Sequence, residues 1–222
     1  MEIRTQFHRE MREIQQDVLV MGNRVEKAIL HSINALKDRD LDAAQQIIDA
    51  DIDINKKRYE IEAKCIRIIA TQQPMASDLR VIMSVVNVIT ELERIGDHAE
   101  GIAKIVVMTG DEPPLKPLID LPRMAEKTAE MLHRSLDAFI NRDTDAARHI
   151  TAEDDEVDEL YTQVFRELLS FMAEDPKTIN RATRLIWVAH NLERSADRVT
   201  NICERVVFMV TGKVEEIGAS NY

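Results

Sequence analysis

The chain has 222 residues, a formal net charge of −11, 45% hydrophobic residues and only 4% aromatic residues. This acidic balance argues against nucleic acid as a partner and against direct adsorption on anionic lipid, because both need a basic surface. No stretch is apolar enough for a signal peptide or a transmembrane helix, so we expect a cytoplasmic protein that associates with membranes only through partners. An aliphatic composition with 6 glycines and 6 prolines favours long helices over a β-sandwich.

The first half of the chain, residues 1–110, predicts three helices of roughly thirty residues each. Asp40 is a candidate N-cap for the second helix, with a further aspartate in its first turn. Pro74 fits the first position of the third helix, and Gly110 fits its C-terminal end. Because the turns between these helices are short, neighbouring helices should run antiparallel.

The second half, residues 118–222, repeats this pattern after a proline-rich linker at residues 111–117. Asp143 matches Asp40 at an offset of 103 residues, and each is followed by Asp-Ala-Ala two positions later. Asp175 with Pro176 predicts the start of the last helix, and Gly212 predicts its end. The sequence therefore predicts an all-α fold in which six long helices form two homologous antiparallel three-helix bundles.

A doubled motif lies in the last helix of each half. Residues 92–97 read Leu-Glu-Arg-Ile-Gly-Asp, and residues 192–197 read Leu-Glu-Arg-Ser-Ala-Asp. Each copy places two carboxylates four residues apart, and this spacing stacks them on one face of a helix. The carboxylates lie beside the apolar seam that each helix directs to its core, so one side is shielded and the other meets solvent.

The predicted hairpins bring further oxygen-bearing side chains to the level of each motif. Residues equidistant from the turn that joins two helices lie at the same height, and the second motif helix also carries an imidazole one turn before its carboxylates. The candidate metal ligands are Glu93, Asp97, Asp51 and Asn55 in the first half and Glu193, Asp197, Asp154, Asp158 and His190 in the second.

Two interpretations of these clusters stay open. Clustered carboxylates repel one another unless a cation or bound protons compensate, and oxygen ligands suit Mg, Mn, Fe or Ca, with an imidazole favouring Fe or Zn. The same residues could instead form solvated, ion-paired faces that only tie the helices together.

We expect no catalytic residues. The chain has no nucleophile elbow, no phosphate-binding glycine loop and no dinucleotide fingerprint. A di-iron bundle site needs two Glu-x-x-His motifs, and only Glu130 with His133 fits. Cys65 and Cys203 are expected to be small buried hydrophobic side chains. The alternative is a metal-dependent enzyme or a metal store that uses the same carboxylates.

The two motifs, the Ala-Ser-Asp-Leu-Arg segment at residues 76–80 and the shared Asp-x-x-Ala helix starts resemble the PhoU family. The resemblance extends from about residue 5 to Gly212. It implies a cytosolic accessory of the phosphate-specific ABC transporter that negatively regulates the phosphate-starvation response. It also implies an adaptor that links the transporter ATPase to the sensor histidine kinase of the two-component system.

The resemblance further implies a homodimer and metal binding at Glu93, Asp97, Glu193 and Asp197, with Fe, Zn, Mn or Mg as candidate divalent or ferric ions. The second motif departs from the usual pattern, because Ser195-Ala196 replaces Ile-Gly. This replacement predicts that the two candidate metal sites are not equivalent.

Overall fold

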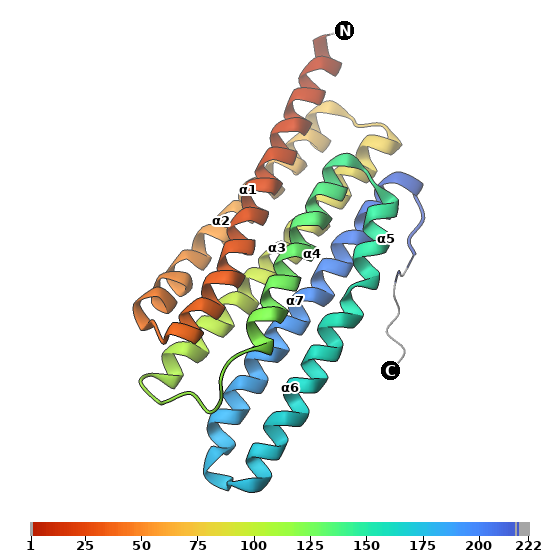
Figure 1. The fold of residues 1–222 in the computed structure, drawn as a ribbon. Helices are drawn as coiled ribbons and strands as arrows, with labels where there is room; N and C mark the ends of the chain where they lie inside the picture. The colour runs from red at the N-terminus through yellow and green to blue at the C-terminus, as the bar shows by residue number, and fades with distance from the viewer. Residues whose placement is uncertain (1, 216, 218–222) are drawn as a thin grey trace.

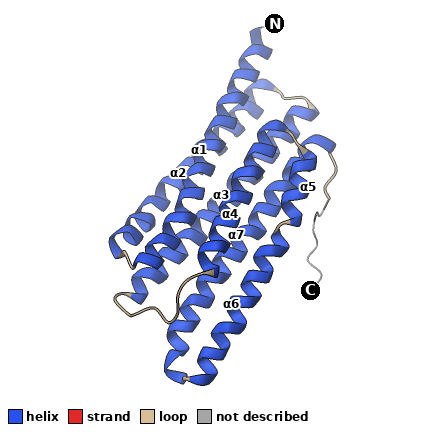
Figure 2. Ribbon diagram, viewed as in Figure 1, coloured by secondary structure: helices blue, strands red, loops and turns tan. Residues whose placement is uncertain are grey.

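A computed structural model describes residues 2–215 and 217 of the chain, and within them the fold is entirely helical (Figure 2). The predicted all-α fold is therefore confirmed. The helices are α1 (Glu2–Asp38), α2 (Leu41–Gln72), α3 (Ala76–Thr109), α4 (Asp120–Asn141), α5 (Thr144–Ala152), α6 (Asp154–Glu174) and α7 (Ile179–Thr211), with a 3₁₀ turn at Pro176–Thr178.

The connection between α1 and α2 has the same construction as the connection between α4 and α5. The side chain of Asp40 accepts a hydrogen bond from the first turn of α2 at 2.9 Å, and Asp143 caps α5 in the same way at 2.9 and 3.1 Å. The preceding residues, Arg39 and Arg142, both adopt the left-handed conformation, with φ of 55° and 56°. In each case the aspartate N–H donates to the carbonyl five residues earlier, at 3.0 and 2.9 Å. Residues separated by 103 therefore occupy matching places on either side of these turns.

The remaining helix ends agree with the predictions at three of four positions. Gly110 and Gly212 end α3 and α7 with positive φ, and Asp175 caps the turn that Pro176 begins. The prediction that Pro74 is the first helical residue is wrong, because α3 begins at Ala76. The chain first reverses at residues 73–75, where Gln73 closes α2 in the left-handed conformation.

The fifth predicted helix is present but interrupted. Glu153 separates α5 from α6, whereas α2 runs through the matching position, Ala50, without a break. The second half therefore has a bend where the first half has a continuous helix.

The two halves share one hydrophobic core. The long helix α3 packs along α7, and α1 packs on α4, while α2 and α6 lie at opposite edges of the molecule (Figure 1). Leu92 and Leu192 of the doubled motif are fully buried in this core. Cys65 and Cys203 are also buried, as predicted, and burial raises the pKa of each thiol to about 12.

The division into domains at residues 1–110 and 118–222, joined by 111–117, stays a prediction. Residues 1, 216 and 218–222 of these ranges lie outside the described part of the chain. None of the described helices is both long and apolar enough to cross a membrane.

Candidate functional site

A first acidic cluster forms where α2 meets α3. It contains Asp51 and Asn55 from α2 and Glu93, Asp97 and Glu100 from α3. Asn55 Nδ2 donates a hydrogen bond to Asp51 Oδ2 at 2.7 Å, while Asp51 Oδ1 is buried without a hydrogen-bond partner. A Cβ atom on Gly96 would lie 3.5 Å from that oxygen and 3.2 Å from the Ile54 side chain. The glycine of the first motif therefore leaves room for the Ile54 side chain, whereas the contact with the carboxylate would be an ordinary one.

The charges in the first acidic cluster oppose one another. Burial raises the pKa of Asp51 to about 6, and the negative charges of Asp97, Glu100 and Glu93 add to the effect. The pKa values of Glu93 and Asp97 are also raised, first by burial and then by neighbouring carboxylates. Arg58 offers partial relief, with Nη1 3.9 Å from Glu93 Oε1. The cluster is therefore short of positive charge near neutral pH.

A second acidic cluster lies where α6 meets α7. It contains Asp154 and Asp158 from α6 and Glu193 and Asp197 from α7. Asp154 Oδ1 and Glu193 Oε2 are both buried without a hydrogen-bond partner. Burial, together with the neighbouring carboxylates, raises the pKa of Asp154 and of Glu193 to about 7 and raises that of Asp158. Two carboxylates of the second acidic cluster thus have a strongly raised pKa, as Asp51 has in the first.

The imidazole of the second half lies at the rim of this cluster. His190 Nδ1 is 3.4 Å from Glu193 Oε2, without the alignment of a hydrogen bond, and its side chain is 55% exposed. The ring of Tyr161 lies 6.2 Å from the His190 ring between centroids. Arg194 donates a hydrogen bond to Asp197 and neutralises part of the cluster. The first half has Thr90 at the place of His190, so the two clusters differ in ligand chemistry.

In each half, the structure brings the predicted ligand residues together at the same height along the helix pair. His190 lies at the edge of the second group. Three neighbours of the clusters were not among the predicted residues: Glu100, Arg58 and Tyr161. Arg58 and Tyr161 follow Asp51 and Asp154 by seven residues, so they lie on the same helix faces. Helical spacing alone would therefore have identified both.

The donor set fits a hard cation by its chemistry. Three buried carboxylate oxygens lack partners, and the raised pKa values show that a bound proton or cation would be stabilised there. Among the described residues, however, no three His, Cys, Asp or Glu side chains are arranged so that they could hold one ion. Metal binding therefore stays a prediction.

Comparison with known proteins identifies two copies of one domain. A family model described as the PhoU domain matches residues 18–106 and 121–206. The chain is 40% identical over 208 residues to a Clostridium acetobutylicum protein named phosphate-specific transport system accessory protein PhoU homolog, covering 93% of this chain and 95% of that one. It is 38% identical over 208 residues to the Escherichia coli K12 protein named phosphate-specific transport system accessory protein PhoU, with coverage of 94% and 86%.

Two solved structures have the same fold. The crystal structure of PhoU from Pseudomonas aeruginosa superposes with a TM-score of 0.89 at 36% identity, covering 93% of this chain and 100% of that one. The phosphate transport system regulatory protein PhoU from Streptococcus pneumoniae gives a TM-score of 0.88 at 32% identity, with coverage of 94% and 99%. These proteins are named as accessory and regulatory proteins, in agreement with the prediction of a non-enzyme.

Proposed function

The chain belongs to the PhoU family of phosphate transport accessory proteins, and we propose that it is a non-enzymatic negative regulator of phosphate uptake and of the phosphate-starvation response. It acts in the cytoplasm as an adaptor between the ATPase of the phosphate ABC transporter and the sensor histidine kinase of the two-component system. The observation that carries this proposal is the PhoU match in both halves, at 38–40% identity over more than nine-tenths of the chain.

Deletion of the gene in its own organism tests the regulatory part of the proposal. We expect phosphate-starvation genes to be expressed in phosphate-rich medium after deletion, and wild-type protein supplied in trans to restore repression. A deletion strain that still represses these genes in rich medium would refute negative regulation. A measurement of phosphate uptake in the same strains separates control of the transporter from control of gene expression.

We also propose that the two acidic clusters bind a divalent or ferric cation: Fe, Zn, Mn or Mg. In the first half Asp51, Asn55, Glu93 and Asp97 supply oxygen donors, and in the second Asp154, Asp158, Glu193 and Asp197 do so, with His190 at the rim. The unpartnered buried oxygens support this proposal, because a cation would offset their mutual repulsion. The cation would link α2 to α3 in the first half and α6 to α7 in the second.

Elemental analysis of the purified protein tests the metal proposal. We expect metal above background in the wild type, with part lost in Glu93→Ala/Asp97→Ala and part in Glu193→Ala/Asp197→Ala. Repression that survives complete loss of metal would show that the metal is structural only. Background metal in the wild type, after purification without chelator and with each candidate metal supplied, would refute the proposal. The proposed homodimer is tested separately by light scattering of the same samples.

A further inference from the structure

An exposed apolar surface extends over α6 and α7 beside the second acidic cluster. Trp187, the one tryptophan of the chain, is 50% exposed there, with Leu169 at 45% and Phe165 at 37%. The Tyr161 ring lies 6.2 Å from the Phe165 ring and 6.2 Å from the His190 ring between centroids. We name these five residues the aromatic face. Large aromatic side chains that stay in solvent on one face are typical of binding surfaces.

Helical register places these side chains on one continuous surface. Phe165 and Leu169 follow Tyr161 at steps of four residues along α6, and Trp187 precedes His190 by three residues on α7. Because α6 and α7 are antiparallel and the rings of Tyr161 and His190 lie side by side, Phe165 lies at the height of Trp187. In the described part of the chain α6 is the outermost helix on its side of the molecule, so this surface is open to a partner (Figure 1).

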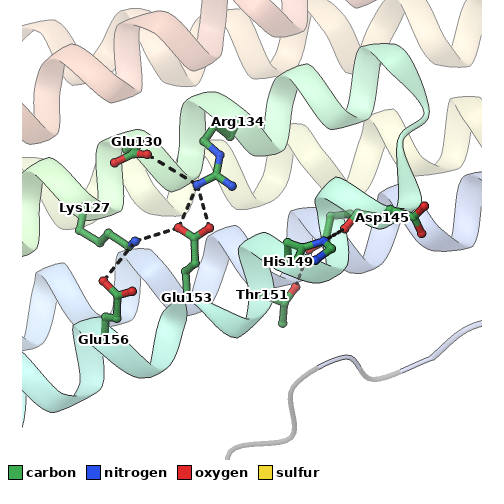
Figure 3. A network of polar contacts seen from close by, with 9 residues as sticks. Lys127, Glu130, Arg134, Asp145, His149, Thr151, Glu153 and Glu156 are labelled. Carbon is green, nitrogen blue, oxygen red and sulfur yellow. Dashed lines mark hydrogen bonds and ion pairs between the residues drawn. The ribbon is translucent and has the colours of Figure 1, made fainter.

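The carboxylates on the opposite side of α6 are paired within the fold. The helix carries seven carboxylates and one arginine. Figure 3 shows Lys127 of α4 between two of the acidic side chains, with Nζ 3.2 Å from Glu156 and 2.8 Å from Glu153, which precedes the helix. Glu167 lies three turns after Glu156 on the same side and pairs with Lys116 of the linker. These charges are therefore already neutralised by cations of the same half.

The carboxylates beside the aromatic face lack such partners. Asp155 and Glu159 are exposed and Asp158 is half-buried, and none of the three has an ion pair among the described residues. One cation, Arg166, lies on this side of α6, while Arg194 of α7 already donates to a carboxylate of the second acidic cluster. The aromatic face is therefore bordered by net negative charge.

This negative charge is not required by the fold. At the 103-residue offset, Ile52, Asn55 and Lys56 replace the three unpaired carboxylates, and Glu62 replaces Phe165. Over its whole length α2 carries six carboxylates and five basic residues, so it is almost neutral. Because both halves form equivalent helix pairs, folding does not explain why the second half alone combines aromatic and acidic side chains here. Binding of a partner does explain it.

The charge of this surface decides between the possible occupants. A second copy that paired through the same face would bring two sets of like charges together. Anionic lipid and nucleic acid are repelled by the same carboxylates. A protein segment with Lys or Arg beside apolar side chains satisfies both features. Its cations pair with the carboxylates or stack on the Trp187 ring, and its apolar groups cover Phe165 and Leu169.

We propose that the aromatic face docks a basic, amphipathic segment of one of the two partner proteins. Lys or Arg side chains of this segment pair with Asp155, Asp158 and Glu159. The surface from Asp155 to Leu169 is about 21 Å long, which matches a helical segment of about four turns. This inference rests on the proposed adaptor function, because it names the chemistry by which one partner docks.

Removal of charge alone tests the basic character of the partner. The purified transporter ATPase and the cytoplasmic part of the kinase are each titrated with Asp155→Asn/Glu159→Gln, in which neither residue is a proposed metal ligand. Glu13→Gln/Glu126→Gln is the matched control, because it removes two charges from exposed positions of α1 and α4. We expect the first variant to bind one partner about three- to tenfold more weakly than the control, with a smaller difference at high salt. Equal binding by the two variants overturns the basic segment.

Truncation of the exposed apolar side chains tests the other half of the proposal. We expect Phe165→Ala/Trp187→Ala to bind the same partner at least about tenfold more weakly, and Leu169→Ser, which leaves both rings in place, to bind it more weakly as well. Tyr59→Ala/Ile66→Ala truncates two exposed side chains of α2 and should bind that partner like the wild type. Circular dichroism confirms that each variant is folded.

The outcomes separate the docking inference from the proposed function. Wild-type affinity in both truncations of the aromatic face overturns the docking inference alone. A wild-type chain that binds neither the ATPase nor the kinase overturns the adaptor proposal and the docking inference together.

Sedimentation at increasing protein concentration distinguishes a second copy from a partner segment. If the wild type forms a dimer that Phe165→Ala/Trp187→Ala dissociates, the aromatic face is buried between copies and the partner segment is overturned. The same oligomeric state in both proteins supports the partner segment.

Discussion

Replacement of Asp154 by asparagine should stabilise the metal-free protein at neutral and alkaline pH. Asp154 is a mostly buried carboxylate of the second acidic cluster, and its Oδ1 has no hydrogen-bond partner. Burial and the charges of Asp158, Asp197 and Glu193 raise its pKa from 3.8 to about 7. Asparagine keeps the shape of the side chain and removes the charge.

The magnitude follows from the difference in proton binding between the folded and unfolded states. Between about pH 4 and pH 7 the unfolded chain has lost the Asp154 proton while the folded chain still holds it, so wild-type stability falls as pH rises. From about pH 5 to pH 7 this loss is at most about 2.7 kcal/mol, at about 1.4 kcal/mol per pH unit. Solvent screens part of the repulsion, so we expect about half of that, roughly 1.5 kcal/mol.

The assay is urea unfolding followed by circular dichroism at about pH 5 and pH 8, with chelator present. The free-energy advantage of Asp154→Asn over the wild type should be larger at pH 8 than at pH 5 by roughly 1.5 kcal/mol. Glu159→Gln removes the same charge from an exposed position of α6 and should show no such change. An advantage that is constant with pH, or that shrinks as pH rises, would refute the electrostatic description of the cluster.

Three further results are expected. Asp17→Ala should lower the free energy of unfolding by about 1–3 kcal/mol in urea unfolding, because Lys57 and Lys64 pair with this carboxylate at 2.6 and 2.5 Å. The loss should vanish at a pH below the lowered pKa of Asp17, where the carboxylate is protonated, and a loss independent of pH would contradict the ion pairing. Gly22→Val should lower stability by about 1–3 kcal/mol, because even a Cβ atom there would lie 2.1 Å from the buried Leu136 side chain; a melting temperature equal to wild type would refute the close approach of α1 and α4. Asp143→Ala should cost about 1 kcal/mol through loss of the α5 cap, and Asp143→Asn should retain most of that stability in the same assay.

Local signals in the sequence predicted most of the fold. The caps Asp40 and Asp143 and the terminal glycines mark helix ends through backbone chemistry that does not depend on tertiary packing. The interruption at Glu153 could not be predicted in this way, because its carboxylate is held by cations on another helix, α4. The prediction that Pro74 is the first residue of α3 was wrong because several turn geometries accept a proline near a helix start.

For the candidate clusters, the sequence predicts which helix faces carry the residues but not how their side chains are directed. The register of two antiparallel helices depends on the position of the turn between them. This register places Asp51 near Glu93 and Asp154 near Glu193. Whether those oxygens converge on one ion depends on side-chain rotamers and on neighbours such as Glu100. Periodicity identifies a helix face but does not determine the direction of a carboxylate group.

The most direct test of the account is whether one chain bridges its two proposed partners. The purified protein, the transporter ATPase and the cytoplasmic part of the sensor kinase would be mixed at equal concentrations, and the masses of the complexes measured by analytical ultracentrifugation. The adaptor proposal predicts a ternary complex that disappears when this chain is omitted. Binding to neither partner, or to one partner only at the expense of the other, would contradict it.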